Sequence, residues 1–220
     1  MSNSSARLDD PVAGLRRDLR FEDTLLGRRY AFRSTWGLFS PRGVDEGTRL
    51  LLDHLEVGEA DACLDLGCGW GPLGVAMAGA APRGRTLLVD KDFVAVDYAR
   101  RNLEGNGLAN AEARLSNGFS HVGAEDFDVI AANLPAKVGK ELLLILLHDA
   151  RRHLRPGGSL YVVTVTGLRR FVARHFEAVL GDYDKLKQGR HYTVARATVA
   201  RAGPGVGAAL GAPGAGGAGA

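Results

Sequence analysis

The chain has 220 residues, 45% of them apolar, which is enough to bury the core of one ordinary domain. Its 28 basic and 25 acidic residues leave a net charge of +3, too balanced to indicate a nucleic-acid-binding protein by itself. Two cysteines, Cys63 and Cys68, exclude a disulfide framework, and without a Cys/His cluster no metal site is expected. The longest apolar run, 142–147, is too short to span a bilayer, and the first residues lack an apolar signal sequence. We therefore expect a soluble, cytoplasmic protein without a membrane partner.

Composition divides the chain into three parts. Residues 1–58 are arginine-rich and end in a helix-like stretch, 45–55, which Asp45 could cap; we expect this segment to pack on the core as a helical extension. Residues 59–202 carry the repeated strand and helix patterns of a folded domain. Residues 203–220 are nearly all Gly, Ala and Pro and are typical of a disordered tail, with a partner-binding segment as the alternative.

The central part alternates strands and helices. We expect strands at 62–66, 85–90, 111–115, 127–132 and 159–166, and helices at 72–81, 93–106, 139–154 and 168–180, the third of these ended by Pro156-Gly157-Gly158. Two further strand-like segments, 183–187 and 192–199, flank a short turn and predict a hairpin. The predicted fold class is α/β, a doubly wound, mostly parallel seven-stranded sheet with an antiparallel C-terminal hairpin.

The strongest local motif is Asp65-Leu66-Gly67-Cys68-Gly69-Trp70-Gly71, between a strand and a helix. Glycines there allow a tight turn and close approach of a ligand, at the strand ends where open α/β sheets bind ligands. Gly69, Gly71 and Gly74 also match the dinucleotide pattern, which keeps an NAD-binding reading open. The carboxylate of Asp65 argues against a phosphate at the helix N-terminus and suits a cationic or amine ligand. Trp70 is expected to pack near the loop.

Two further polar positions follow the next strands. Asp90 ends the second strand, where a carboxylate accepts both ribose hydroxyls of an adenosine, whether of NAD or of S-adenosylmethionine. Lys91 beside it joins the candidate site, although alone it is typical of a surface or capping residue. Ser116-Asn117-Gly118-Phe119 follows the third strand, so that Asn117 can bond an adenine edge while Phe119 packs on its face. A plain Asn-Gly turn is the alternative for this segment.

The motif Asn133-Leu134-Pro135-Ala136 directly follows the fourth strand. Pro135 biases Leu134 toward an extended conformation, which would direct the Leu134 carbonyl and the Asn133 side-chain oxygen to one point. Two such acceptors can bond both hydrogens of a planar amine and aim its lone pair at an electrophilic methyl group. Positioning of this kind lowers the barrier without a strong base. An ordinary strand-to-loop exit is the alternative.

These motifs, in this spacing, resemble the "methyltransferase small" family, and within it the short, single-domain members related to the small-subunit ribosomal RNA guanine-N2 methyltransferases. Gly37-Leu38-Phe39-Ser40-Pro41, followed by Val44-Asp45 and by Gly47-Thr48-Arg49-Leu50-Leu51, is similar to the family's GVFS…D.G..LLL segment. The likeness covers roughly residues 32–196 and implies a Rossmann-like class I methyltransferase domain in 59–202.

The resemblance implies a role for each matching position. Asp65, Gly67 and Gly69 would line the methionine part of S-adenosylmethionine, Asp90 would hold its ribose, and Asn117 and Phe119 its adenine. Phe39 and Ser40 would close the pocket. Asn133, with Leu134 and Pro135, would hold the target nitrogen. The full set of candidate cofactor-binding residues is Phe39, Ser40, Asp65, Gly67, Cys68, Gly69, Gly71, Asp90, Lys91, Asn117, Gly118, Phe119 and Asn133.

One departure from the family pattern affects the acceptor. The family's fourth motif position is commonly aromatic, and this chain has Ala136 there, so another ring, such as Trp36 or Tyr192, would have to stack on a target base. The expected substrate is structured ribosomal RNA, with Arg169, Arg170 and the basic strip 185–201 as candidate phosphate contacts. A protein glutamine amide, a small metabolite or a non-catalytic cofactor-binding module remain as alternatives.

Overall fold

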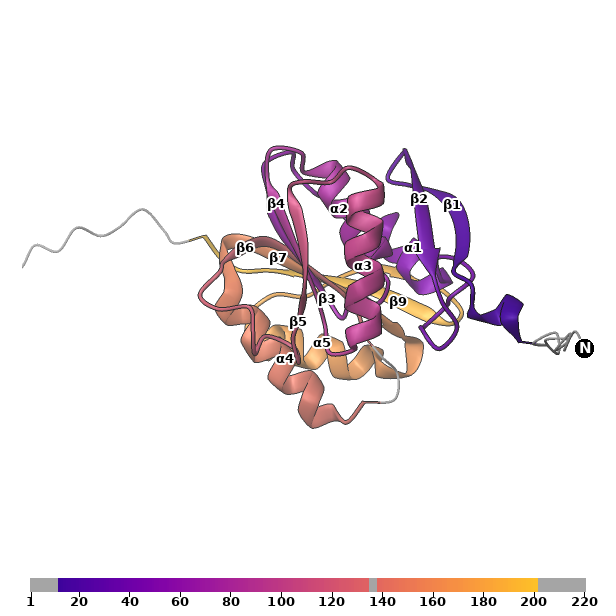
Figure 1. Cartoon of the computed structure of the whole chain (residues 1–220). Helices are drawn as coiled ribbons and strands as arrows, with labels where there is room; N and C mark the ends of the chain where they lie inside the picture. Colours follow the sequence, from indigo (N-terminus) through magenta and orange to yellow (C-terminus); the bar gives the residue numbers. More distant parts are fainter. Residues whose placement is uncertain (1–11, 135–137, 202–220) are drawn as a thin grey trace, which may run out of the picture.

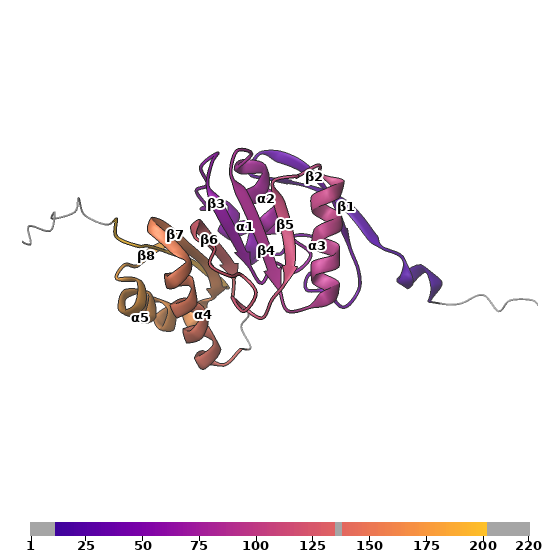
Figure 2. The same ribbon diagram turned by 60° about the vertical axis from the view of Figure 1, so that its left-hand side comes forward.

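The computed structural model describes residues 12–134 and 138–201, which form a seven-stranded sheet with helices on both faces and a separate N-terminal hairpin (Figure 1, Figure 2). The strands of the large sheet are β3 (Ala62–Leu66), β4 (Arg85–Asp90), β5 (Ala111–Leu115), β6 (Phe127–Asn133), β7 (Leu154–Val165), β8 (Asp184–Gln188) and β9 (Tyr192–Thr198). The helices are α1 (Glu46–Leu52), α2 (Pro72–Ala80), α3 (Phe93–Gly105), α4 (Lys140–His153) and α5 (Arg169–Leu180), with short 3-10 turns at Ala13–Arg16 and Thr166–Leu168.

The strand order across the sheet is β5-β4-β3-β6-β7-β9-β8. All neighbours from β5 to β7 pair in parallel, whereas β9 is antiparallel to both β7 and β8. The predicted doubly wound, mostly parallel sheet with an antiparallel C-terminal hairpin is therefore confirmed. Because β8 and β7 are both antiparallel to β9, β8 ends at the same edge of the sheet as β3 to β7.

Two apolar cores cover the two faces of the sheet, because successive residues of a strand point to opposite sides. In β3, Cys63 belongs to the core under α1, α2 and α3, and Leu64 belongs to the core under α4 and α5. Both side chains are fully buried. Burial on both faces explains why β3, β4, β6 and β7 read as apolar runs in the sequence rather than as alternating patterns.

The N-terminal segment contains a β-hairpin that the sequence analysis missed, since it predicted only a helical extension there. Strands β1 (Leu19–Leu25) and β2 (Arg28–Ser34) pair antiparallel through a two-residue turn, in which Leu26 and Gly27 have φ values of 48° and 76°. Two positive φ values match the backbone twist of a tight hairpin, but leucine is an unusual residue there, which is why the signal is weak.

Asn102 of α3 and Asn106, the C-cap of this helix, attach the hairpin to the domain. The Asn102 side chain accepts from the N–H of Arg33 at 2.7 Å and donates to the Arg33 carbonyl at 2.9 Å. Asn106 makes the same pair of bonds to Ala31, at 2.9 and 2.8 Å. These side-chain amides thus continue the ladder of β2 as a neighbouring strand would, and Asn102 also donates to the Trp70 carbonyl in the glycine-rich loop.

The strand after α4 begins earlier than predicted, at residue 154 instead of 159, while the helix itself ends within one residue of its predicted end. Helix α4 ends at His153, and β7 begins at Leu154, so that Pro156-Gly157-Gly158 lies inside the strand instead of ending the helix. The register between β6 and β7 shifts in this region, and Gly157 has φ 86°. The segment is therefore an irregular part of β7, of the kind that a β-bulge produces. The predicted tail 203–220, together with Pro135 and Ala136, lies outside the described residues.

Candidate functional site

A cavity of about 360 Å³ opens where β3, β4, β5 and β6 end. Its wall combines the loop before α1, the loops after these four strands and the first turns of α4. The predicted site residues that line it are Phe39, Ser40, Gly67, Cys68, Gly69, Asp90, Lys91, Asn117, Gly118, Asn133 and Leu134. The fold therefore brings most of the predicted set together, and their roles toward a ligand stay predictions.

The glycine-rich loop after β3 forms the floor of the cavity. Gly67 and Gly69 have φ values of 78° and 54°, which L side chains rarely adopt, and a Cβ at either position would meet no other protein atom. The N–H groups of Gly67 and Cys68 both donate to the Val89 carbonyl, at 2.8 and 2.9 Å. The loop is thus fixed by β4, and open space lies over its two glycines.

Asp65 lies beneath this loop and does not belong to the cavity lining. Its carboxylate is 1% exposed and accepts the N–H of Gly74, in the first turn of α2, at 2.7 Å. Burial, with a smaller contribution from the charge of Asp90, raises the pKa of Asp65 to about 7. At this helix end Pro72 offers no N–H and the Gly74 N–H is used, so a phosphate would find a carboxyl group in place of free donors.

Gly71 and Gly74 have structural reasons for being glycine. Gly71 is the N-cap of α2 with φ 93°, and a Cβ there would approach Leu88 and Ala99 at 3.2 Å. A Cβ at Gly74 would lie 2.3 Å from Leu88 Cγ, so this glycine lets α2 pack closely on β4. The match to the dinucleotide pattern is therefore accounted for by backbone geometry and packing, and neither residue lines the cavity.

Asp90, at the end of β4, orders the backbone around the cavity. Its Oδ2 accepts the N–H of Gly69 and its Oδ1 accepts the N–H of Asp92, both at 2.9 Å. A carboxylate has further acceptor capacity beyond these two bonds, so Asp90 can still accept hydroxyl groups of a ligand. The bond to Gly69 connects the end of β4 to the glycine-rich loop.

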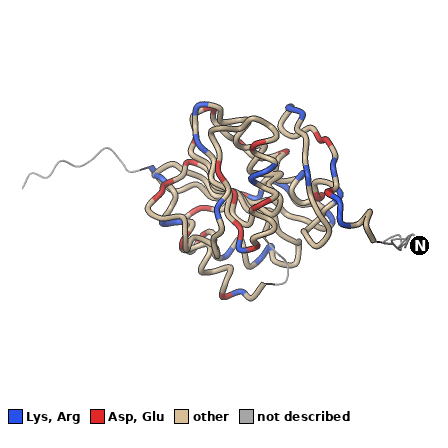
Figure 3. The backbone as a smooth tube through the Cα atoms, viewed as in Figure 1, with Lys and Arg blue, Asp and Glu red and all other residues tan. Residues whose placement is uncertain are grey.

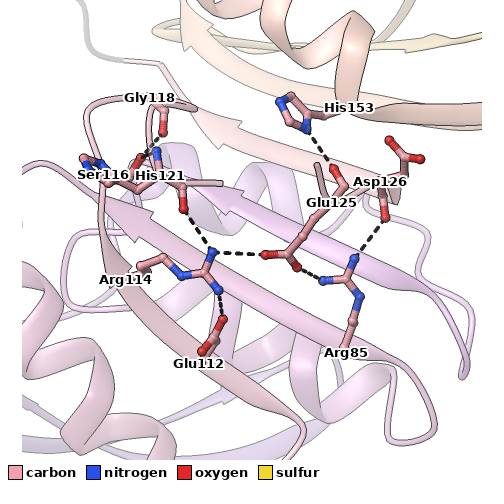
Figure 4. Close-up of polar contacts among 9 residues, drawn as sticks. All are labelled: Arg85, Glu112, Arg114, Ser116, Gly118, His121, Glu125, Asp126 and His153. Carbon is pink, nitrogen blue, oxygen red and sulfur yellow. Dashed lines mark hydrogen bonds and ion pairs between the residues drawn. The ribbon is translucent and has the colours of Figure 1, made fainter. Parts of the chain in front are cut away.

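The loop after β5 is held by a polar network (Figure 4). The Ser116 hydroxyl donates to the Gly118 carbonyl at 2.7 Å and accepts the His121 N–H at 3.0 Å. Arg114 donates to the His121 carbonyl and pairs with Glu125, both at 3.0 Å, and Glu125 also pairs with Arg85 (Figure 4). This network fixes the Asn117-Gly118 turn that lines the cavity.

Phe119 lies away from the cavity. Its ring is 7% exposed and stacks on His153 at a centroid distance of 4.9 Å, inside the core beneath α4. The apolar wall next to Gly118 consists instead of Val138, Leu142 and Leu146, which the sequence analysis did not single out. A Cβ at Gly118 would meet Leu146 Cδ2 at 2.8 Å, so this wall lies directly against the turn.

Asn133 is the last residue of β6 and lines the cavity from the side of α1. Its side-chain nitrogen donates to Asp45 Oδ1 at 3.1 Å and to Thr48 Oγ1 at 3.0 Å. Asp45 also caps α1, as predicted, by accepting the Thr48 N–H at 3.1 Å. Asp45 and Thr48 both line the cavity, although no local pattern predicted a part in the site for either.

Trp70 connects the N-terminal segment to the glycine-rich loop. Its ring is 2% exposed and packs edge-on against Phe21 and Phe32 of the hairpin, at centroid distances of 5.4 and 5.2 Å. The indole N–H donates to the Phe39 carbonyl at 3.1 Å. Trp70 therefore packs as predicted, and it also fixes the backbone at Phe39, which lines the cavity.

Comparison with known sequences assigns the family. The sequence model described as "Methyltransferase small domain" matches residues 29–196, most of the chain. The chain belongs to the methyltransferase small domain family. This confirms the resemblance found in the motifs.

Individual proteins are similar to this chain over more than half of its length. YbxB of Bacillus subtilis is 34% identical over 141 residues, 63% of this chain and 70% of that protein. Ribosomal RNA small subunit methyltransferase C of Klebsiella pneumoniae is 40% identical over 131 residues, which cover 58% of this chain and 38% of the relative. The chain thus spans less than half the length of that methyltransferase.

A solved structure shows the same fold. The T. thermophilus 16S rRNA N2 G1207 methyltransferase, in complex with AdoMet and guanosine, is 28% identical and superposes with a TM-score of 0.75. The match covers 83% of this chain and 50% of that one. The chain is accordingly a methyltransferase domain of the class I, Rossmann-like type. The similarity extends over about half of the T. thermophilus enzyme.

No helix among residues 12–134 and 138–201 is long and apolar enough to cross a membrane. Within the same residues no group of three His, Cys, Asp or Glu side chains is arranged to hold a metal ion.

Proposed function

We propose that the protein is an S-adenosylmethionine-dependent N-methyltransferase that modifies the exocyclic N2 amine of a guanine in ribosomal RNA. The observation that carries this proposal is the Asn133 amide at the cavity wall, whose nitrogen is bonded to Asp45 and Thr48. The amide oxygen is thereby available as an acceptor for an incoming amine. The family assignment and the relatives that act on small-subunit ribosomal RNA support the choice of substrate.

The cavity fits S-adenosylmethionine. Open space over Gly67 and Gly69 admits a ligand against the backbone, and Asp90 at the next strand end has acceptor capacity left for ribose hydroxyls. The wall of Val138, Leu142 and Leu146 beside Gly118 offers an apolar surface for a flat ring such as adenine. The volume of the cavity, about 360 Å³, lies at the lower end of the roughly 300–1,000 Å³ typical of small-molecule sites. The carboxyl of Asp65 at the N-terminus of α2 disfavours a dinucleotide phosphate.

The residues of the chain orient the acceptor. S-adenosylmethionine, when bound, supplies an electrophilic methyl group on a sulfonium. Asn133 Oδ1 and the Leu134 carbonyl accept the two hydrogens of the amine and aim its lone pair into the cavity. Held in this geometry, the nitrogen reacts without a strong base, since positioning lowers the barrier by several kcal/mol. The amine proton is released to solvent after the transfer.

Basic side chains at the cavity edge of the sheet can contact RNA phosphates. The β8–β9 turn lies at this edge because β8 runs in the direction of β7, and the exposed side chains of Lys187 and Arg190 flank the turn. Helix α5 starts at the same edge with Arg169 and Arg170. Arg196, by contrast, is paired with Glu56 and Asp184 and is less suited to this role.

Phosphate binding would depend on these few residues at the edge of the sheet. Acidic and basic segments are interspersed in the view of Figure 3. This pattern agrees with the nearly balanced composition and with a substrate held at one edge of the sheet.

The aromatic face that Ala136 does not provide can come from Trp36. This ring is 39% exposed, and the Arg42 guanidinium lies 4.7 Å from its centroid, which combines a stacking surface with a positive charge. Tyr192 is less suited, because its ring packs against α1 at Gly47. Phe39, which lines the cavity three residues after Trp36, keeps its predicted role of closing the cofactor pocket.

The test is transfer of a radiolabelled methyl group from S-adenosylmethionine to naked ribosomal RNA, small ribosomal subunits, transfer RNA and ribosomal proteins, offered in parallel. We expect label in ribosomal RNA, recovered as N2-methylguanosine after nuclease digestion, and its loss in Asn133→Ala. Label confined to protein or to a small-molecule fraction would favour the glutamine-amide or metabolite alternative. Full activity of Asn133→Ala would reject the site, and calorimetry without cofactor binding would favour a non-catalytic module.

A further inference from the structure

The Asn133 amide is held by two side chains from a distant part of the sequence. Asp45 and Thr48 belong to the N-terminal segment, 88 and 85 residues before Asn133. One oxygen of Asp45 accepts both the Asn133 side chain, at 3.1 Å, and the Thr48 N–H, at 3.1 Å. Thr48 is 4% exposed, so its bond to Asn133 is shielded from water. The three side chains form one connected group at the cavity wall.

This arrangement determines which way the amide faces. An ionised carboxylate only accepts hydrogen bonds, so the amide must present its nitrogen to Asp45. Its oxygen is then directed away from α1 and is left for a ligand. Were the amide reversed, its N–H groups would meet the hydrogens of the target amine and repel it. The orientation needed for the proposed reaction is thus imposed by α1 and its cap.

We propose that Asp45 and Thr48 are positioning residues that hold Asn133 with its oxygen toward the acceptor amine. This inference rests on the proposed function, since it assigns the two residues a role in the same transfer step. The carboxylate also polarises the amide that it binds, which makes Asn133 Oδ1 a stronger acceptor. An acceptor of this kind stabilises the positive charge that develops on the amine nitrogen during transfer.

Thr48→Val is the most direct variant, because it removes the hydroxyl and keeps the shape of the side chain. One amide hydrogen of Asn133 then loses its partner, and the amide can turn. We expect kcat to fall about tenfold with the KM for S-adenosylmethionine within about twofold, because only the acceptor loses its alignment. Thr48→Ser restores the hydroxyl and should recover most of kcat.

Asp45→Asn separates the hydrogen bond from the charge. Asparagine is as good an N-cap as aspartate and can still accept from Asn133, so α1 should form and melting temperature should change little. Loss of the charge should lower kcat by an intermediate factor, about threefold to fivefold, since charge-assisted bonds are about twice as strong as neutral ones.

Thr193→Val is the matched control. Thr193 is a threonine of β9 that is 1% exposed, and its hydroxyl has no partner within the described residues. This variant should keep kcat unchanged. A Thr48→Val enzyme with full kcat, or one whose kcat is not recovered by Thr48→Ser, overturns the inference while the proposed function stands. Full activity of Asn133→Ala would instead overturn both.

Discussion

Asp65 Oδ2 accepts the backbone N–H of Gly74 at 2.7 Å, so a buried carboxyl group lies at the N-terminus of α2. Desolvation raises its pKa from an ordinary 3.8 to about 7, against the smaller lowering effect of the Gly74 bond. Between these two pH values the folded protein holds a proton that the unfolded chain has released. The contribution of Asp65 to the free energy of unfolding is therefore fully present below pH 4, and it is lost as the pH rises toward 7.

Asp65→Asn should remove this pH dependence, because asparagine does not ionise and its oxygen can still accept the Gly74 N–H. The variant should become more stable relative to the parent as the pH rises from 5 through 7, and the difference should level off by about pH 8, one unit above the folded pKa. The gain is at most about 1.4 kcal/mol for each pH unit in that interval. Urea unfolding at pH 5, 6, 7 and 8 measures it. A stability difference independent of pH, or one equal to that of the exposed control Asp53→Asn, would contradict the assignment.

Gly69 and Gly74 belong to the same motif, and their alanine variants should fail in different ways. Gly69→Ala places a methyl group in open space over the loop, with φ 54° adding about 1 kcal/mol of backbone strain. We expect the Kd for S-adenosylmethionine to rise more than tenfold while the protein stays folded, because the methyl group occupies ligand space. Calorimetry gives the Kd, and circular dichroism checks the fold.

Gly74→Ala should instead weaken folding. Its methyl group would lie 2.3 Å from Leu88 Cγ, so α2 must move away from β4, at a cost of roughly 1–3 kcal/mol in the free energy of unfolding. We expect a lower melting temperature and, at a temperature where the variant is folded, a smaller loss of cofactor affinity than in Gly69→Ala. The reverse ranking of the two variants would show that Gly74, not Gly69, faces the ligand.

The parallel sheet was predictable because each strand and helix carries its own local signal. Pro72 starts α2 at its first position, as expected, and Asp45 caps α1. The glycine-rich loop, Asp90 and Asn133 were found together because each directly follows a strand, and parallel strands end at one edge of the sheet. These positions needed no knowledge of distant contacts.

The parts of the site that the sequence did not reveal depend on long-range contacts. Phe119 follows the third predicted strand just as Asn117 does, yet its ring turns into the core against His153, which no local pattern shows. The hairpin is held by Asn102, a buried polar residue of the amphipathic helix α3. Its partner in β2, Arg33, lies 69 residues away in the sequence. Asp45 could be recognised as a cap, but its second partner, Asn133, is visible only after folding.

Lys187 and Arg190 should contribute to RNA binding and not to cofactor binding. Replacing both by glutamate puts negative charge at the edge where the strands end, so the KM for ribosomal RNA should rise at least tenfold and depend less steeply on salt. The Kd for S-adenosylmethionine should stay unchanged. Arg83→Glu, at the exposed ion pair of Arg83 with Glu59, provides a control at another part of the surface, and it changes the net charge as much as either single replacement does. An equal effect of the control would mean that net charge alone is measured.

Trp36 and Phe39 lie in one loop, and their alanine variants should separate acceptor binding from cofactor binding. The Phe39 ring is 68% exposed and lines the cavity, while its carbonyl is fixed by the Trp70 indole, so the ring can cover a bound cofactor without moving the backbone. We expect Phe39→Ala to raise the Kd for S-adenosylmethionine about tenfold, from lost apolar contact, with a smaller effect on the KM for RNA.

Trp36→Ala should give the opposite result, because loss of base stacking and of the Arg42 contact weakens the binding of the acceptor RNA by about 1–3 kcal/mol. The KM for RNA should therefore rise between fivefold and about a hundredfold, with the cofactor Kd unchanged. Trp36→Phe keeps an aromatic face and should recover most of the affinity. If Phe39→Ala raises the KM for RNA while Trp36→Ala leaves it unchanged, then Phe39 is the ring that replaces the aromatic residue missing at Ala136.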